Sequence, residues 1–390
     1  MKALFTTQPA ASHLDPMLPL AHELVARGWD VSVAAPEPFR ATVERRGFAF
    51  HPVGLPWLES SAAEAFPELA TMPLEKVAAW WAHNIFADRA GKQTARDLIE
   101  LCDIERPDLI VRDYYDYGAW AVGVATAIPT VVVGLMFYSA ASGSRDFYGD
   151  RLDGILEAIG LPAAENLESL HGDLYVDLIP GVYQFERPTH GVQMRAADRD
   201  VHAEPLEWVR ELPEPRVLVT FGTVFNSAES LTNIVTALAD EPVSMIVTTG
   251  PGIDPAALGP LPANTRAVAF ADYGRLMPDC AAVVCHAGFG TVMQALAHDL
   301  PVVAVPQSAD QPGHAMRCAA LGAGFDLGPA PAPEAVRDAV RESLHSAEIR
   351  SATERLGEAV RGLPAASAAA DAVEQLMRER RAAPASAPVR

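Results

Sequence analysis

The feature that most constrains the fold is an alternation of short apolar runs with helical patterns, which begins at the first residues. Lys2–Thr6 is an apolar run suited to a buried strand, and the turn-rich residues 7–13 follow it. Residues 14–25 then repeat apolar side chains at helical spacing, Gly28 stands just past their end, and Val31–Ala35 is the next apolar run. Strand, helix and strand at this spacing predict a βαβ unit of a parallel sheet.

The alternation continues in two series along the chain. We expect further strands at Leu109–Arg112, Thr130–Val133, Val217–Thr220, Val243–Thr248, Ala267–Phe270, Ala282–Cys285 and Val302–Val305, and an Ala/Arg/Glu-rich helix over 335–378. Charged, proline-containing residues near 195–215 separate the two series. The pattern predicts two doubly wound α/β domains, at 1–200 and 215–360, with a linker at 201–214 and a flexible tail at 381–390.

The net charge narrows the classes of partner. With 30 Lys and Arg against 50 Asp and Glu, the formal net charge is −20, and neither half supplies a basic face. Binding to nucleic acid or to an anionic membrane needs such a face, so both are disfavoured. The longest apolar stretch, 128–137, is too short to span a bilayer, and the first residues turn polar at Thr6, too soon for a signal peptide. Four cysteines without a C-x-x-C pair fit a cytoplasmic, reduced protein without a zinc site.

In open parallel sheets, ligands bind beyond the carboxyl ends of the strands. In the second series these ends carry Gly222-Thr223 and the glycine-rich residues 286–291, which lead into a helical pattern. Glycines at a helix start let backbone N–H groups approach a phosphate, and the helix dipole favours its charge. A tight turn that needs glycine for packing alone is an equal alternative. There is no G-K-[ST] phosphate loop, and Met293 breaks the dinucleotide motif G-x-G-x-x-G.

Two further pairs of residues carry chemistry. Asp310 and Gln311 follow the last strand and offer a carboxylate and an amide suited to sugar hydroxyls, with a surface turn as the alternative. His13 starts the first helical pattern and Asp113 ends a strand, so both lie on one sheet edge, where a His–Asp hydrogen bond can form. A neutral imidazole held by a carboxylate is what a general base for a hydroxyl requires. The alternative for each residue is a helix or turn cap.

These residues together resemble the family-1 glycosyltransferases of the GT-B fold, most of all the bacterial enzymes that attach deoxysugars to polyketides, macrolides and other natural products. The resemblance rests on the opening 12–21, on Arg112-Asp113, and most specifically on residues 286–311, from His-Ala-Gly-Phe-Gly-Thr to Asp-Gln. It implies two Rossmann-like domains that face each other across a cleft. The first binds the acceptor, the second binds the nucleotide sugar, and a C-terminal helix at 361–380 packs back on the first.

The resemblance also implies a role for each matching residue. His13 matches the catalytic base and Asp113 the acid that orients it. The matches to nucleotide and diphosphate contacts are Gly222, Thr223, Phe270 (which stacks on the base), His286, Gly288, Gly290 and Thr291. Asp310 and Gln311 match ligands of the donor sugar. His314 stands where a number of relatives have Asn, and Asp272-Tyr273 replaces the common Pro-Gln.

The activity implied is that of an inverting hexosyltransferase without a metal or other cofactor. Its co-substrates would be a nucleotide sugar, expected to carry dTDP and a deoxyhexose, and a hydrophobic aglycone. Aromatic residues in 55–90 and 136–155 suit an acceptor pocket or, alternatively, an ordinary core. A homodimer stays open. Other functions that stay open are a catalytically silent GT-B small-molecule binder or helper protein and a sugar-nucleotide epimerase.

Overall fold

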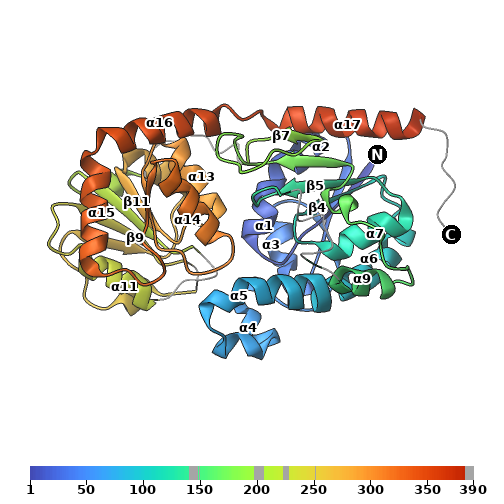
Figure 1. Ribbon diagram of the computed structural model, residues 1–390, viewed down its shortest axis with the longest axis horizontal. Coiled ribbons are helices and arrows are strands. Elements are labelled where there is room, and N and C mark those ends of the chain that lie inside the picture. Colours follow the sequence, from blue (N-terminus) through green and yellow to red (C-terminus); the bar gives the residue numbers. More distant parts are fainter. Residues whose placement is uncertain (140–147, 149, 197–205, 223–227, 251, 383–390) are drawn as a thin grey trace. The chain divides into compact units, whose positions relative to one another are not determined.

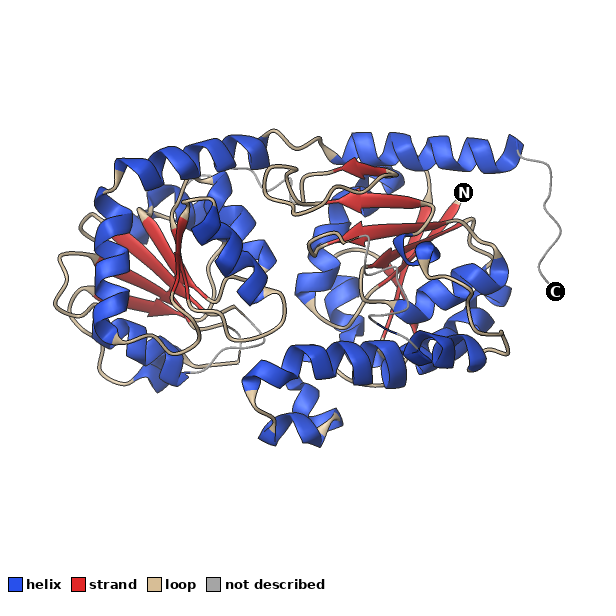
Figure 2. Cartoon of the chain, in the orientation of Figure 1, coloured by secondary structure: helices blue, strands red, loops and turns tan. Residues whose placement is uncertain are grey.

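The computed structural model describes residues 1–139, 148, 150–196, 206–222, 228–250 and 252–382. The chain divides into two compact units, one of Met1–Asp198 with Leu363–Arg390 and one of Arg199–Gly362. Each unit is a parallel sheet with helices packed on its faces (Figures 1 and 2). In the described part of the chain, no helix combines the length and apolarity needed to cross a membrane.

The sheet of the first unit has the strand order β3-β2-β1-β4-β5-β6-β7. Its strands are β1 (Lys2–Thr6), β2 (Asp30–Ala35), β3 (Ala49–Pro52), β4 (Leu109–Asp113), β5 (Thr130–Gly134), β6 (Leu174–Asp177) and β7 (Gly191–Gln193). The helices are α1 (Ala11–Leu14), α2 (Leu18–Ala26), α3 (Arg40–Arg45), α4 (Ala62–Ala65), α5 (Leu74–Trp81), α6 (Ala90–Glu105), α7 (Tyr117–Thr126), α9 (Asp150–Glu157) and α17 (Ala366–Ala382). Short 3₁₀ turns and a π-helical segment, η5 (Ala82–Arg89), connect them.

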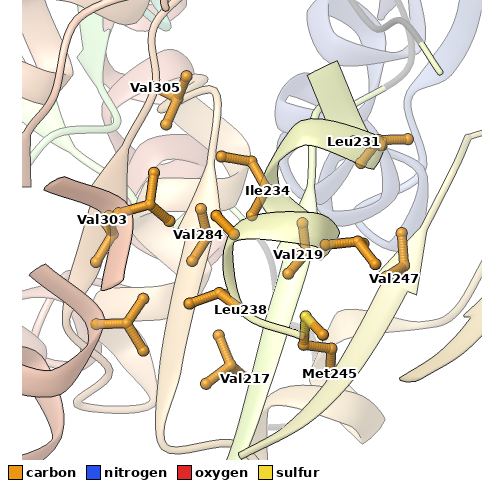
Figure 3. Packing of buried hydrophobic residues seen from close by; sticks show 14 of the residues in the cluster. Val217, Val219, Leu231, Ile234, Leu238, Met245, Val247, Val284, Val303 and Val305 are labelled. Carbon is orange, nitrogen blue, oxygen red and sulfur yellow. The ribbon is translucent and has the colours of Figure 1, made fainter. Parts of the chain in front are cut away.

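The sheet of the second unit has the order β10-β9-β8-β11-β12-β13. Its strands are β8 (Arg216–Thr220), β9 (Ser244–Thr248), β10 (Thr265–Val268), β11 (Ala282–Cys285), β12 (Val302–Ala304) and β13 (Gly324–Asp326). The helices are α10 (Glu207–Arg210), α11 (Ala228–Ala237), α12 (Tyr273–Leu276), α13 (Phe289–Ala297), α14 (Gln311–Ala320), α15 (Pro333–His345) and α16 (Ala347–Arg361). Branched side chains of β8, β9, β11 and β12 interdigitate with α11 to form the core (Figure 3).

Two expectations about single elements are wrong. The strand expected at 267–270 ends at Val268, so Phe270 lies in the loop beyond it. The helix expected over 335–378 is three helices. Ser346 has extended backbone, and its hydroxyl accepts a hydrogen bond from the Ile349 N–H, which starts α16 afresh. A second break precedes α17, where Pro364 cannot supply the N–H that a continuing helix needs.

The short strands β3, β6, β7 and β13 were not expected. All four have only three or four residues, too short for a period of two to be visible, and β3, β7 and β13 have no fully buried residue. The last helix, α17, packs on α2, β6 and β7 of the first unit (Figure 1). Arg27 at the end of α2 binds Asp371 and Glu374 of α17 at 2.7 and 3.3 Å. The C-terminal helix therefore belongs to the unit with which the chain begins.

Both sheets have a point where the strand order reverses, between β1 and β4 and between β8 and β11. Such switch points are where open α/β sheets bind ligands, because the two following loops diverge there. The register pairs Thr6 with Arg112 and Thr220 with Cys285. The loops that follow these pairs therefore start side by side, and they carry most of the residues singled out in the sequence.

Candidate active site

The switch point of the first unit brings His13 and Asp113 together. His13 lies on α1, the short helix after β1, and Asp113 is the last residue of β4. His13 Nδ1 is 3.5 Å from Asp113 Oδ2, an ion-pair separation that is longer than a well-formed hydrogen bond. The expected His–Asp pair is present in the structure.

Backbone N–H groups fix the Asp113 carboxylate from both sides. Its Oδ2 accepts a hydrogen bond from the Gln8 N–H at 2.6 Å, and its Oδ1 accepts one from the Tyr115 N–H at 2.7 Å. The side chain is completely buried. Burial alone would raise the pKa of Asp113, but the His13 charge and these two donors outweigh it and lower the pKa. The residue is thus an ionised carboxylate that ties together the loops after β1 and β4.

A second carboxylate, which the sequence did not reveal, approaches His13 from the opposite side. Glu59 Oε1 is 3.7 Å from His13 Nε2, and both side chains are about nine-tenths buried. Burial alone would lower the pKa of His13, but the negative charges of Asp113 and Glu59 outweigh it and hold the pKa well above its usual range. The two carboxylates therefore favour the protonated imidazole, whereas a general base has to be neutral when it accepts the hydroxyl proton. The only signal for Glu59 in the sequence was its place directly after the apolar residues 55–58.

Aromatic rings surround this pair. Phe86 and Tyr115 lie with their ring centroids 6.3 and 6.1 Å from that of His13. Behind Phe86, Trp57 and Trp81 are in ring contact with it and with each other, and both are at most 5% exposed. Phe86, Trp57 and Trp81 are buried and Tyr115 is half-buried, and together the four rings give His13 a largely apolar setting. Of the other aromatic stretch considered, residues 140–147 and 149 lie outside the described part.

In the second unit the His286 ring lies against two glycines. A Cβ added at Gly222 would lie 2.7 Å from His286 Nε2, and one added at Gly288 would lie 2.5 Å from the same atom. Gly222 also has a φ of +73°, which side-chain-bearing residues rarely adopt. Both glycines are therefore explained by packing against the imidazole. Burial lowers the pKa of His286 to about 4, against a weaker opposing effect of the Thr220 backbone, so the ring is neutral at pH 7.

The start of α13 has the properties of an anion site. Gly288 is its N-cap residue, and the amides of Gly290 and Thr291 fall in the first turn, where no intrahelical acceptor exists. A Cβ added at Gly290 would meet no atom within 4 Å, so the backbone is open to a ligand there. The helix start adds about half a positive charge. Gly290 and Thr291 thus fit a diphosphate, whereas Thr223 lies outside the described residues.

Asp310 and Gln311 make specific contacts inside the second unit. Asp310 Oδ2 accepts a hydrogen bond from the Phe289 N–H at 3.1 Å, which places its carboxylate at the start of α13. Gln311 is buried, and its Oε1 accepts hydrogen bonds from the Gln307 and Ser308 N–H groups at 2.7 and 2.9 Å. Because these donors take the amide oxygen, the Gln311 N–H2 is the group left to reach a sugar hydroxyl.

Three neighbouring side chains complete this region. His314 is fully buried 3.5 Å from Asp310, and burial lowers its pKa to about 3. Phe270 is 74% exposed in the loop after β10, as a stacking platform requires. Asp272 accepts a hydrogen bond from the Gly274 N–H and so caps α12.

No group of three or more His, Cys, Asp or Glu side chains is placed to hold a metal ion in the described part of the chain. The cysteines Cys102, Cys280, Cys285 and Cys318 are free thiols. Burial raises the pKa of Cys102, Cys280 and Cys285 to about 12, so these three are not reactive thiolates.

Residues 233–376 match the family model described as the erythromycin biosynthesis protein CIII-like C-terminal domain. The chain is 30% identical to 4'-demethylrebeccamycin synthase of Lentzea aerocolonigenes, over 96% of this chain and 99% of the relative. It is 28% identical to 10-deoxymethynolide desosaminyltransferase of Streptomyces venezuelae, over 99% of this chain and 100% of that relative. The crystal structure of the glycosyltransferase VinC in complex with dTDP superposes with a TM-score of 0.77 at 25% identity, covering 98% of this chain and 100% of VinC. The expected GT-B fold is thereby confirmed.

Proposed function

Because the chain belongs to the glycosyltransferases that attach deoxysugars to antibiotics and related natural products, we propose that it transfers a deoxyhexose from a dTDP-sugar to a hydroxyl of a hydrophobic aglycone. The transfer inverts the anomeric carbon and uses no metal ion. The observation that carries the proposal is the His13–Asp113 pair at the switch point of the first unit. A silent binding protein has no need of a buried base held by an ionised carboxylate.

The first unit activates the acceptor. Asp113 takes the Nδ1 side of the ring, so Nε2 is the atom that faces the acceptor hydroxyl. The hydroxyl proton passes to Nε2 while the acceptor oxygen forms a bond to the anomeric carbon. The bond from that carbon to the diphosphate oxygen breaks on the opposite side, and the diphosphate leaves with the electron pair. Asp113 then stabilises the imidazolium through its negative charge.

The second unit holds the donor and stabilises the leaving group. The Gly290 and Thr291 amides and the α13 dipole accept the charge that develops on the diphosphate. Phe270 stacks on the nucleobase, while Asp310 and the Gln311 amide N–H2 bind sugar hydroxyls. The VinC complex with dTDP supports the choice of nucleotide for this chain.

A panel of nucleotide sugars and aglycones, read by mass spectrometry of the products, tests the proposal. We expect a glycosylated aglycone with dTDP donors, and loss of about 10²–10⁴-fold in turnover for His13→Gln. At 100 times its Kd, dTDP should stabilise both wild type and this variant by about 2.7 kcal/mol. Undiminished turnover by His13→Gln refutes the role of His13 as the base. Equal stabilisation by UDP at the same concentration as dTDP refutes the choice of dTDP as the donor nucleotide.

A further inference from the structure

Glu59 meets His13 at the ring atom that the reaction needs. Its Oε1 lies 3.7 Å from Nε2, whereas Asp113 lies on the Nδ1 side. Nε2 is also the atom assigned above to the acceptor hydroxyl. Glu59 therefore stands where the proposed acceptor hydroxyl has to bind.

The position of Glu59 is fixed by the loop that carries the base. Glu59 begins the 3₁₀ turn η3 (Glu59–Ser61), and its backbone N–H donates a hydrogen bond to the Pro9 carbonyl at 3.2 Å. Pro9 lies four residues before His13. A backbone hydrogen bond thus joins the segment that carries the Glu59 carboxylate to the loop that carries the His13 imidazole.

A buried carboxylate requires a partner, because removing its charge from water is costly. In the described part of the chain, His13 is the basic side chain within ion-pair distance of the Glu59 carboxylate. The titratable groups that face the ring are Asp113 from β4, Glu59 from η3 and the Tyr115 phenol from the turn after β4, while Phe86 of η5 adds an apolar wall. Two carboxylates around one imidazole favour its protonated form.

We propose that Glu59 is a second positioning residue for the base His13. The Glu59 carboxylate pairs with Nε2 and keeps the ring protonated until the acceptor hydroxyl displaces it. As the carboxylate is displaced, the proton on Nε2 passes to Glu59 and from there to water. The ring is left neutral, with its lone pair directed at the acceptor. This inference rests on the proposed function, since it assigns Nε2 to the acceptor.

Histidine titration by NMR tests the pairing without any turnover. The full chain is labelled with ¹³C-histidine, and the His13 signal is assigned by its loss in His13→Gln. We expect Glu59→Gln to lower the titration midpoint of His13 by about one pH unit or more. The matched control is Glu64→Gln, because Glu64 is an exposed glutamate on the adjoining helix α4. An unchanged midpoint in Glu59→Gln, or an equal change in Glu64→Gln, overturns the proposal.

A second variant and a rate measurement separate the pairing from a structural effect. Glu59→Asp keeps the charge and should retain a midpoint above that of Glu59→Gln, whereas equal midpoints contradict a role for the carboxylate. With a substrate pair that turns over, the acid limb of kcat/KM should move with the NMR midpoint. For a one-unit shift of the midpoint, the ratio of kcat/KM in Glu59→Gln to kcat/KM in wild type then rises about tenfold at low pH. If His13 is not the base, the midpoint moves but the acid limb does not, so the two proposals fail separately.

Discussion

Replacing Gly288 by alanine tests whether the His286 ring is what requires glycine at this position. Gly288 has an ordinary extended backbone, with φ −66° and ψ 148°, so alanine adds no backbone strain there. Its Cβ would lie 2.5 Å from His286 Nε2, closer than side chains pack. The ring or the loop must move, and overpacking of this kind costs about 1–3 kcal/mol.

Two other glycines separate the clash from the backbone effect. At Gly259 φ is +72° and a Cβ would meet nothing within 4 Å, so Gly259→Ala measures the left-handed backbone alone, at about 1–2 kcal/mol. Gly222 has nearly the same φ, +73°, and a Cβ there would also contact the ring at 2.7 Å. Gly222→Ala should therefore cost about the sum of the two effects, roughly 2–5 kcal/mol.

The assay is hydrogen exchange of the β8 and β11 peptides at increasing urea, which reports the free energy of unfolding of the second unit alone. The free energy of unfolding is measured for each glycine-to-alanine substitution, both in the wild-type background and in the His286→Ala background. Without the ring, Gly288→Ala should cost about 0 kcal/mol, and Gly222→Ala should fall to the value of Gly259→Ala. The reasoning is refuted if Gly288→Ala costs the same with and without His286.

Three more predictions concern charge at the two switch points. Because the pKa of His13 is raised and the base must be unprotonated, kcat/KM should increase with pH through a pKa above 6.5; a profile that is flat from pH 5.5 upward contradicts this. Burial holds the pKa of His286 at about 4, and the negative charge of a bound diphosphate should raise that pKa. At pH 5.5 the wild type should therefore take up more protons on binding dTDP than His286→Gln does. Calorimetry in several buffers measures this proton uptake. Equal uptake in both proteins would place the diphosphate elsewhere. Asp113→Asn should lower the free energy of unfolding of the first unit in urea by about 1–3 kcal/mol, since one backbone N–H donor then faces an amide N–H2. Asp108 also accepts a backbone hydrogen bond but is partly exposed, so Asp108→Asn should have a smaller effect.

The sequence was sufficient for the features that arise from local patterns. The runs at Lys2–Thr6 and Ala282–Cys285 are strands at those bounds, because a fully buried parallel strand needs an unbroken apolar run. The pairing of His13 with Asp113 also followed, since both residues come at the carboxyl ends of parallel strands, which share one edge. The three helices between Pro333 and Ala382 were less accessible, because a uniform Ala/Arg/Glu composition masks the break at Ser346.

Only the tertiary structure decided how these residues are surrounded. Glu59 reaches His13 from 46 positions away in an aperiodic segment, and no local pattern encodes such a contact. The same holds for the glycines at 222 and 288, since only the structure shows that an added Cβ there would contact the His286 ring, whereas one at Gly290 would meet no atom within 4 Å. Periodicity and turn residues are set by neighbours in the chain, whereas burial, charge and close approach are set by segments that folding brings together. The sequence therefore determined that His13 and Asp113 meet at the first switch point, and the fold determined the third partner, Glu59, and the packing around the pair.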